Sequence, residues 1–262
     1  MELPIYQIDA FTDRAFAGNP AAVMPLQSWL PDQLMQQIAA ENNLAETAFF
    51  VPKGDGFHLR WFTPTVEIAL CGHATLASAY VITRFLEPGR PSVSFDSMSG
   101  PLIVTCDGDR LALDFPRLST KPADEKIDLV AGCLSHRPYS VFDSDDYIAY
   151  FAVFDDEATV RQIMPDMVAM MKLDKDIVVT APGDEVDFVS RLFAPLHGIP
   201  EDPVTGSTHC VLAPYWAGRL RKDRFHARQA SPRGGDLWIE LQSERVVISG
   251  YGVCVMKGTM TV

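Results

Sequence analysis

Hydrophobic and polar residues alternate along much of the chain with the period of a β-strand, and in two stretches with the period of a helix. The helical spacing predicts one surface helix over residues 31–42 and another over 156–171. Many short strands with few helices are typical of an α+β fold. The inward positions are Leu34, Met35, Ile38 and Ala39 in the first helix and Val160, Ile163, Met167 and Met171 in the second. Strands are predicted near residues 4–11, 20–25, 47–52, 58–63, 92–97, 101–106, 110–115, 147–153, 177–180, 187–193, 236–242 and 245–250.

One eight-residue pattern, F-x-x-R-x-F-x-P, occurs twice. It reads FHLRWFTP from Phe57 to Pro64 and FVSRLFAP from Phe188 to Pro195, a spacing of 131 residues (188 − 57). Each copy alternates like a strand and ends at a proline, which has no N–H to continue a central ladder of hydrogen bonds. The repeat indicates that the chain is built from two similar halves.

A loop, a glycine and an apolar stretch rich in small residues follow each copy of the pattern. These stretches read GHATLASAYVI from Gly72 and GSTHCVLAPYW from Gly206. Because both are apolar nearly all round, they predict helices that are enclosed on every side. Pro214 should shorten or kink the second helix, or lie near its first turn. We therefore expect two pseudo-symmetric half-barrels, each a curled, mostly antiparallel sheet around a central buried helix.

The boundary between the halves is expected between Pro116 and Asp128, where prolines and a charged stretch interrupt the pattern. This division predicts an N-terminal half over residues 1–118 and a C-terminal half over 119–262. A C-terminal strand near 254–262 is a candidate to complete the N-terminal half.

The acidic composition excludes several classes of protein. With 22 Lys and Arg against 34 Asp and Glu, the formal charge is −12, and 47% of the residues are hydrophobic. A surface that repels phosphate disfavours a nucleic-acid partner, and a chain so rich in apolar residues is not disordered. No apolar run approaches the roughly 18 residues of a membrane span, and no charged leader precedes a long apolar block. We expect a cytoplasmic protein without a membrane partner.

Neither the cysteines nor any known motif indicates a metal or a cofactor. The five cysteines form no C-x-x-C pair and lie mostly in apolar surroundings, which favours reduced thiols over disulfides or a zinc site. The chain has no phosphate-binding loop, dinucleotide fingerprint or zinc spacing. We therefore expect neither a metal nor a cofactor.

The starts of the two buried helices carry residue types that do chemistry. A helix start offers unpaired backbone N–H groups and a partial positive charge, and a glycine there lets a ligand approach closely. If the halves are related by an approximate two-fold axis, the two starts approach each other at a shared cleft and favour a carboxylate or an enolate. The residues concerned are Cys71, Gly72 and His73 in the first half and Asp202, Thr205, Gly206 and Ser207 in the second.

Each polar residue in this set also has a structural interpretation. A histidine beside a buried helix is often a packed core residue, Ser207 suits a helix N-cap, and Asp202 suits a turn. A site is favoured because His73 and Ser207 hold the same position in two repeats, and neither is a residue that a buried helix prefers.

Five motifs follow one another along the chain. They read DAFTDRAFAGNP from Asp9, NLAET from Asn43, RWFTP from Arg60, GHAT from Gly72 and EDPVTGS from Glu201. In this order they resemble the phenazine-biosynthesis PhzF family, which has the diaminopimelate epimerase-like fold. That fold, two half-barrels with the site between them, agrees with the internal repeat.

The resemblance implies a cofactor-independent isomerase that acts on a small carboxylate-bearing substrate, and a homodimer. It makes Glu46 the general acid/base, which removes a proton from carbon and returns it elsewhere on the same substrate. The supporting positions that the resemblance implies are His73, Asp202 and Ser207 for substrate orientation, Gly72 and Gly206 for the substrate carboxylate, and Asn19 as a further contact.

The surroundings of Glu46 are compatible with this role. Glu46 lies between Leu44 and the apolar run 48–51. Partial burial of a carboxyl group raises its pKa toward the pH at which it can both take and give a proton. The alternative is that Glu46 is a surface residue at the end of the first helix.

A second acid is a weaker hypothesis. Anchoring the halves on Pro52 and Pro182 aligns Glu46 with Asp176. Asp174 and Asp176 also suit a solvated loop before the strand at 177–180, and this is the interpretation that short motifs favour.

One departure from the fold's racemases and epimerases is informative. Those enzymes carry two cysteines, each just before a helix-start glycine, whereas this chain has Cys71 at the first place and Thr205 at the second. Threonine is a far weaker acid than cysteine, so a two-thiol racemisation is not favoured. The alternatives are a one-cysteine epimerase or lyase that uses Cys71 with Thr205 and, in another class, a non-catalytic protein that binds small acids.

Overall fold

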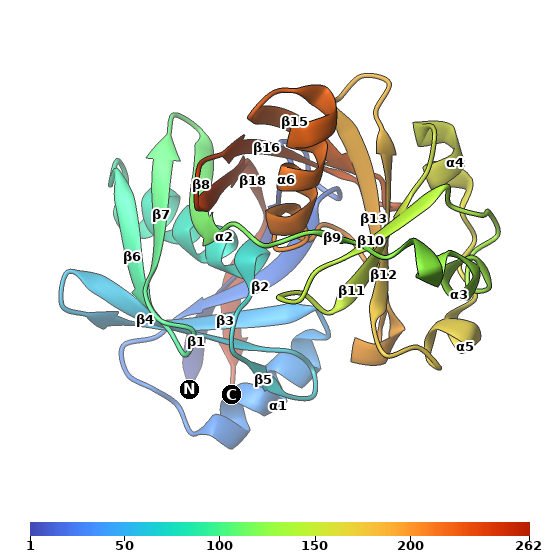
Figure 1. The fold of residues 1–262 in the computed structure, drawn as a ribbon. Coiled ribbons are helices and arrows are strands. Elements are labelled where there is room, and N and C mark those ends of the chain that lie inside the picture. Colours follow the sequence, from blue (N-terminus) through green and yellow to red (C-terminus); the bar gives the residue numbers. More distant parts are fainter. The chain divides into compact units, whose positions relative to one another are not determined.

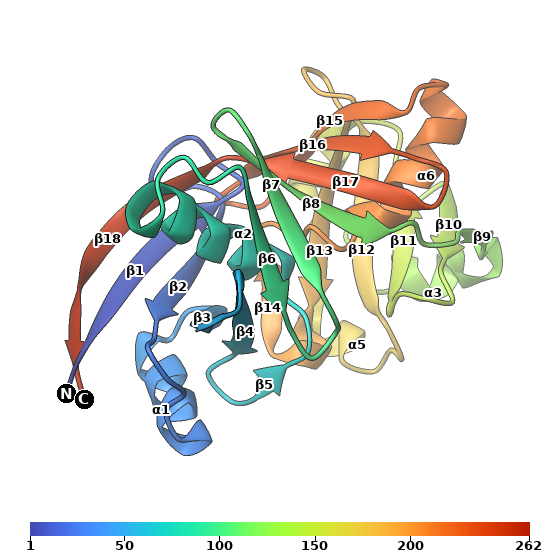
Figure 2. The ribbon, with the colours of Figure 1, turned by 90° about the vertical axis from the view of Figure 1, so that its left-hand side faces the viewer.

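The computed structural model describes residues 1–262, which form two compact units. Unit 1 comprises Met1–Asp114 together with Ser249–Val262, and unit 2 comprises Phe115–Ile248. The last residues of the chain belong to unit 1 because the strand β18 pairs antiparallel with β1, from Glu2 opposite Thr261 to Ala10 opposite Gly252. Figure 2 shows these two strands side by side.

The sheet of unit 1 curls around one helix, α2 (Figure 1). Neighbouring strands are antiparallel except in two pairs, β2 with β3 and β4 with β6, which are parallel. The strands are β1 (Glu2–Ala10), β2 (Asn19–Pro25), β3 (Glu46–Lys53), β4 (Gly56–Phe62), β5 (Glu67–Ile68), β6 (Ser92–Asp96), β7 (Leu102–Asp107), β8 (Arg110–Pro116) and β18 (Gly252–Thr261).

Helix α2 (Gly72–Val81) is the buried helix that the sequence predicts. It contacts β1, β2, β3, β7 and β18, and continues into a π-helical turn, η1 (Ile82–Leu86). Two of its hydroxyl groups bond to carbonyls one turn back: Thr75 donates to the carbonyl of Cys71 at 2.6 Å, and Ser78 to that of Ala74 at 2.7 Å. Polar side chains can therefore occur in a helix that water does not reach.

The outer face of the unit 1 sheet is covered by α1 (Asp32–Asn42), which confirms the first predicted surface helix. Met35 and Ile38 pack in one apolar cluster with Phe49 and Val51 of β3. The helix ends at Asn43, whose left-handed backbone (φ 49°) turns the chain toward β3. With helices on both faces, β3 is buried from its first residue, as a continuous apolar run predicts.

Unit 2 repeats this arrangement of strands. Again two neighbouring pairs are parallel, β11 with β12 and β13 with β15, and they correspond to the parallel pairs of unit 1. The strands are β9 (Lys121–Pro122), β10 (Ser140–Asp143), β11 (Ala149–Val153), β12 (Asp176–Pro182), β13 (Phe188–Ala194), β14 (Ile199–Asp202), β15 (Arg224–Gln229), β16 (Gly235–Leu241) and β17 (Arg245–Gly250).

The second buried helix, α6 (His209–Leu220), begins three residues later than predicted. Residues 206–208 form a tighter turn first, in which the N–H of His209 bonds to the carbonyl of Gly206 at 3.0 Å. Thr208 is the N-cap residue, so the alternative interpretation of Ser207 as N-cap is wrong. Pro214 lies inside the helix, where it cannot bond to the carbonyl of Cys210. The N–H of Leu118 bonds to that carbonyl at 3.2 Å instead.

The single helix predicted over 156–171 is wrong, because the structure has two short helices there. Residue Ile163 leaves helical geometry (ψ 124°), and Pro165 disfavours a helical conformation at the residue before it. Met170 is buried, whereas the predicted inward residue Met171 is exposed. The short helices of unit 2 are α3 (Ile127–Ala131), α4 (Glu157–Gln162) and α5 (Met167–Met170). Unit 2 also has two 3-10 turns, η2 (Asp124–Lys126) and η3 (Pro195–His197).

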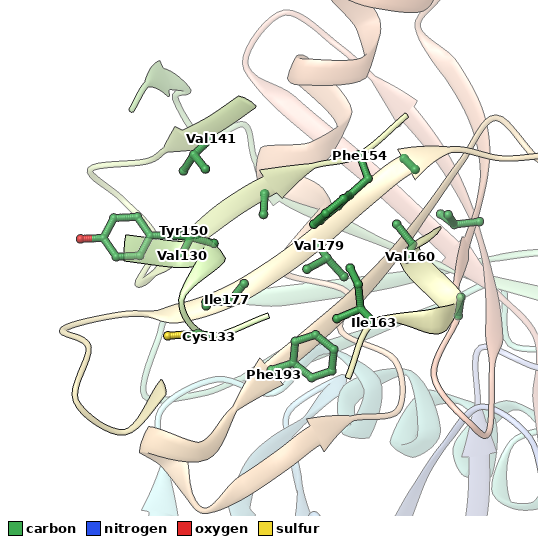
Figure 3. Packing of buried hydrophobic residues seen from close by; sticks show 14 of the residues in the cluster. Val130, Cys133, Val141, Tyr150, Phe154, Val160, Ile163, Ile177, Val179 and Phe193 are labelled. Carbon is green, nitrogen blue, oxygen red and sulfur yellow. The ribbon is translucent and has the colours of Figure 1, made fainter. Parts of the chain in front are cut away.

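The apolar core between α3 and α4 and the outer face of the unit 2 sheet is shown in Figure 3. Val160 and Ile163 point toward Val179 and Phe193 of β12 and β13. On the inner face of the same sheet, the Trp216 indole of α6 donates to the hydroxyl of Thr180 at 3.0 Å. As in unit 1, helices cover both faces of the central strands.

Some strands escaped the sequence analysis for identifiable reasons. β10 has only four residues, and β15 alternates with charged side chains. β5, β9 and β14 have two to four residues each. Strands of this kind carry little hydrophobic periodicity, and their pairing partners determine them.

The arginine of each repeated pattern forms a two-pronged ion pair with a glutamate in the next short strand. Arg60 bonds to Glu67 at 2.6 and 2.7 Å, and Arg191 bonds to Glu201 at 2.8 and 3.0 Å. Each glutamate lies in the spacing E-x-x-x-x-G, five residues before Gly72 or Gly206. The ion pairs thus hold the two loops that lead to the helix starts against their strands.

Arg191→Lys should destabilise the protein by about 1–3 kcal/mol, because lysine cannot form the two-pronged bond and also reach other acceptors. Arg191 donates to the carbonyls of Val160 and Ile163, at 3.0 and 2.9 Å, where α4 ends. Urea unfolding measures the loss. Arg84→Lys, at the exposed pair with Asp109, should change the free energy by less than about 0.5 kcal/mol; equal effects of the two substitutions would contradict the assignment.

Candidate active site

In unit 1 the structure brings together four of the predicted residues from three elements. Asn19 is the first residue of β2, Glu46 is the first residue of β3, and Cys71 and His73 flank the start of α2. β2 and β3 are parallel neighbours, with Ala21 opposite Glu46, so their first residues lie at the same edge of the sheet. All four side chains are buried, which excludes the alternative of Glu46 as a surface residue.

The imidazole of His73 is the centre of this group. Its Nε2 lies 3.1 Å from Oε2 of Glu46, and its Nδ1 lies 3.2 Å from the side-chain amide of Asn19 and 3.5 Å from Sγ of Cys71. The contact between Nε2 and Oε2 does not have the alignment of a hydrogen bond. A carboxylate oxygen therefore lies beside an imidazole while it keeps the capacity to bond to a ligand.

The charge states in this group follow from burial and from the neighbours. Burial opposes protonation of His73, but the adjacent Cys71 and Glu46 favour the imidazolium more strongly, so the pKa of His73 is raised well above its usual value. Burial, and then the charge of Glu46, raise the pKa of the Cys71 thiol. The directions of these two shifts favour the protonated form of each group.

Three of these residues are also candidate ligands for a metal. One atom each from Glu46, Cys71 and His73 lie within 4.8 Å of one another. A metal requires a deprotonated cysteine and a neutral histidine. The raised pKa values of both groups oppose that state, so this set is better suited to exchanging protons than to holding a cation.

The first turn of α2 is arranged to receive an anion. Its N-cap residue, Cys71, has extended backbone and forms no side-chain cap, and Gly72 is the first helical residue. The helix start therefore lacks the side-chain oxygen that usually bonds to its N–H groups, which is the arrangement that a bound carboxylate can complete.

Asn19 is positioned by a strained loop. Phe11 and Phe16 have positive φ angles, 62° and 69°, and the N–H of Phe16 bonds to the buried carboxylate of Asp9 at 2.7 Å. At Gly18 (φ 64°), a Cβ atom would lie 2.2 Å from the carbonyl oxygen of Ala10, so only glycine fits. Backbone strain of this kind is concentrated at functional sites.

Unit 2 holds the other predicted residues on the loop between β14 and α6. Thr205 donates its hydroxyl to the carboxylate of Asp202, and its N–H bonds to Oε1 of Gln229 at 2.8 Å. Gln229 is fully buried and also donates to the carbonyl of Asp202 at 2.8 Å. Thr205 and Gln229 therefore hold Asp202 in place. Gln229 was not predicted from the sequence, because this residue lies in the unpredicted strand β15.

Ser207 has a partner that the sequence analysis also missed. Its Oγ lies 3.1 Å from the hydroxyl of Tyr147. Burial raises the pKa of Tyr147, and so do the nearby carboxylates of Asp202 and Asp176, although the bond to Ser207 lowers it. Tyr147 is therefore a neutral phenol with a proton to donate. Tyr147 lies two residues before Ala149, where the parallel pairing of β11 with β12 begins. This position in the internal repeat is the signal that identifies it.

The chain was compared with known proteins and solved structures. The model of the phenazine biosynthesis-like protein family (PhzC-PhzF) matches residues 8–258. An uncharacterized isomerase of Pseudomonas aeruginosa is 47% identical over 259 residues, which cover 98% of each chain. The structure of a PhzF-family protein of Enterococcus faecalis has a TM-score of 0.96 and 44% identity, and covers 100% of both chains.

A more distant structure shares the fold alone. A hydroxyproline epimerase of Agrobacterium vitis, solved with bound trans-4-hydroxy-L-proline, is 10% identical, has a TM-score of 0.61, and covers 98% of this chain and 92% of that one. These neighbours confirm the α+β fold class, with the diaminopimelate epimerase-like arrangement of half-barrels. No helix of the structure has the length and apolar character needed to cross a membrane. By the extent of these matches, the chain belongs to the phenazine biosynthesis-like protein family.

Proposed function

We propose that this protein is a cofactor-independent isomerase that shifts a proton within a small carboxylate-bearing substrate, with Glu46 as the acid/base. The observation that carries the proposal is the buried contact of 3.1 Å between Glu46 and the imidazole of His73. Relatives named as isomerases support the reaction class. The substrate class is inferred from the open start of α2.

The reaction has two proton transfers and no net change in composition. The Glu46 carboxylate takes a proton from a substrate carbon, and the electrons of that C–H bond form a new double bond as negative charge moves toward the carboxylate. The imidazolium of His73 and the N–H groups at Gly72 stabilise this charge. Glu46 then returns the proton to a different carbon, so that a double bond has moved.

Unit 2 carries polar groups of the kinds that bind a small acid. Ser207 and Tyr147 offer hydroxyl groups, the turn at Gly206 offers backbone N–H groups, and Asp202 offers a carboxylate that Thr205 fixes in place. In this proposal Asn19 orients the ring of His73, to which its amide is bonded.

The epimerase or lyase alternative, with Cys71 and Thr205 as the acid/base pair, is less well supported. Cys71 has a raised pKa, and the hydroxyl of Thr205 is already bonded to Asp202. The proposal also places the protein in the cytoplasm, where its five free cysteines stay reduced, and treats it as a homodimer.

Glu46→Gln should keep the fold and lower the rate by about 10²–10⁴-fold, because the amide cannot take or return a proton. The assay follows deuterium uptake by a panel of small unsaturated and amino acids in deuterated water, by mass spectrometry and NMR. A product of unchanged composition with a moved double bond supports the isomerase.

The control for this test is Glu41→Gln, at an exposed position of α1, which should leave the rate unchanged. An active Glu46→Gln enzyme would remove Glu46 from the mechanism. Loss of optical activity in the substrate favours an epimerase and a new keto product favours a lyase, and either outcome with a dependence on Cys71 replaces the proposal. Tight binding without any exchange indicates a non-catalytic acid-binding protein.

The raised pKa of His73 has a consequence for stability. In the folded protein, His73 stays protonated to a higher pH than it does in the unfolded chain, where its pKa is 6.5. The stabilisation is complete below that pH and is lost as the pH rises through the raised pKa. The difference in unfolding free energy between wild type and His73→Gln should therefore shrink as the pH rises from about 6.5 through the raised pKa of His73. Urea titrations at several pH values measure it, and His136→Gln should keep the wild-type slope.

A further inference from the structure

The internal repeat gives Glu46 an equivalent residue in unit 2. Glu46 is the first residue of β3, and Asp176 is the first residue of β12. Glu46 lies opposite Ala21 in a parallel pair, and Asp176 lies opposite Ala149 in the corresponding parallel pair. The next strands pair in the same register, with Thr47 opposite Phe62 and Ile177 opposite Phe193. The expected solvated loop is therefore wrong for Asp176, which is a buried strand residue.

The side chains around the two carboxylates also correspond. Asn19 lies two residues before Ala21 and contacts His73, while Tyr147 lies two residues before Ala149 and contacts Ser207. In each unit, a polar residue two positions before the first residue of the parallel pair thus contacts the residue just after the glycine, His73 after Gly72 and Ser207 after Gly206. The charge of Asp176 contributes to the raised pKa of Tyr147, the partner of Ser207.

Asp176 has one oxygen engaged and one unused. Its Oδ2 lies 2.8 Å from Nδ1 of His197, whose side chain is 57% exposed. Its Oδ1 is buried and has no hydrogen-bond partner, although the residue is only 7% exposed. A buried carboxylate oxygen without a donor costs stability unless a ligand supplies one. The protein therefore has an acceptor in unit 2 that no side chain or backbone group satisfies.

We infer that Asp176 is a ligand-binding residue of unit 2, whose Oδ1 accepts a hydrogen bond from a hydroxyl or amino substituent of a small acid. The inference rests on the proposed function for the class of its ligand, a small carboxylate. Asp176 is not a second acid/base in this view. It selects acids that carry a donor group in addition to the carboxylate, with His197 holding the orientation of its side chain. An acid without such a group leaves Oδ1 unsatisfied and binds more weakly.

The test uses cyclohexanecarboxylate and its 3-hydroxy and 3-amino derivatives, with binding measured by calorimetry and ligand-observed NMR. Wild type should bind the derivatives about 10- to 100-fold more tightly than the parent acid, the range for a hydrogen bond to a charged group. Asp176→Leu should bind all three within about threefold, since it lacks the acceptor. Leucine has the same branched skeleton as aspartate, so replacing this buried, half-satisfied carboxylate by it should be tolerated by the fold.

The matched control is Asp174→Leu, at an exposed aspartate that accepts only the hydroxyl of Tyr150; it should keep the wild-type preference. Asp176→Asn separates the two sources of donor, because loss of charge weakens binding of the amino derivative more than that of the hydroxy derivative.

Three results overturn the inference: no preference in wild type, including no binding of any of the acids; a preference that survives in Asp176→Leu; or an equal loss in Asp174→Leu. Glu46→Gln should lose proton exchange and keep the preference. If that variant stays active, the proposed function fails while the binding result stands, so the two failures are distinguishable.

Discussion

A helix that is enclosed on every side has no access to water, and the arrangement of unit 1 follows from this constraint. Polar groups in α2 are placed against other groups of the protein. Thr75 and Ser78 bond to carbonyls one turn back along the helix. The imidazole of His73 bonds to Asn19 of β2 and lies in contact with Glu46 of β3, without an aligned hydrogen bond to it. The burial of the helix thus brings a carboxylate and an imidazole together at the edge of the sheet.

Most of the fold is predictable from the repeated pattern, because an alternating strand that ends at proline and a fully apolar helix leave few arrangements. The predicted helix over 156–171 shows the limit, since its periodicity continues across Pro165 although the backbone does not. The contact between Glu46 and His73 depends on strand pairing between distant segments, and no spacing in the sequence encodes it. The place of Glu46 in the site came from the family resemblance alone.

The residues that the sequence analysis missed share one property. Gln229, Tyr147 and Glu201 each act on a residue in a neighbouring element, and each is recognised only once the pairing of the strands is known. Their types, an amide, a phenol and a carboxylate, are common on surfaces and carry no signal by themselves. The two units also show how one scaffold takes different chemistry, since the position of the His73 imidazole in unit 1 is occupied by the Ser207 hydroxyl in unit 2.

The pairing of β18 with β1 makes the order of folding differ from the order of synthesis. Unit 2 is a continuous segment, Phe115–Ile248, and its strands are all available before the last residues are made. Unit 1 must wait for Gly252–Thr261 before β1 has its second neighbour. Until then one edge of a strongly apolar sheet stays open, in a segment that is made before unit 2. Of the two units, the one that begins first in the chain therefore depends longer on protection from aggregation.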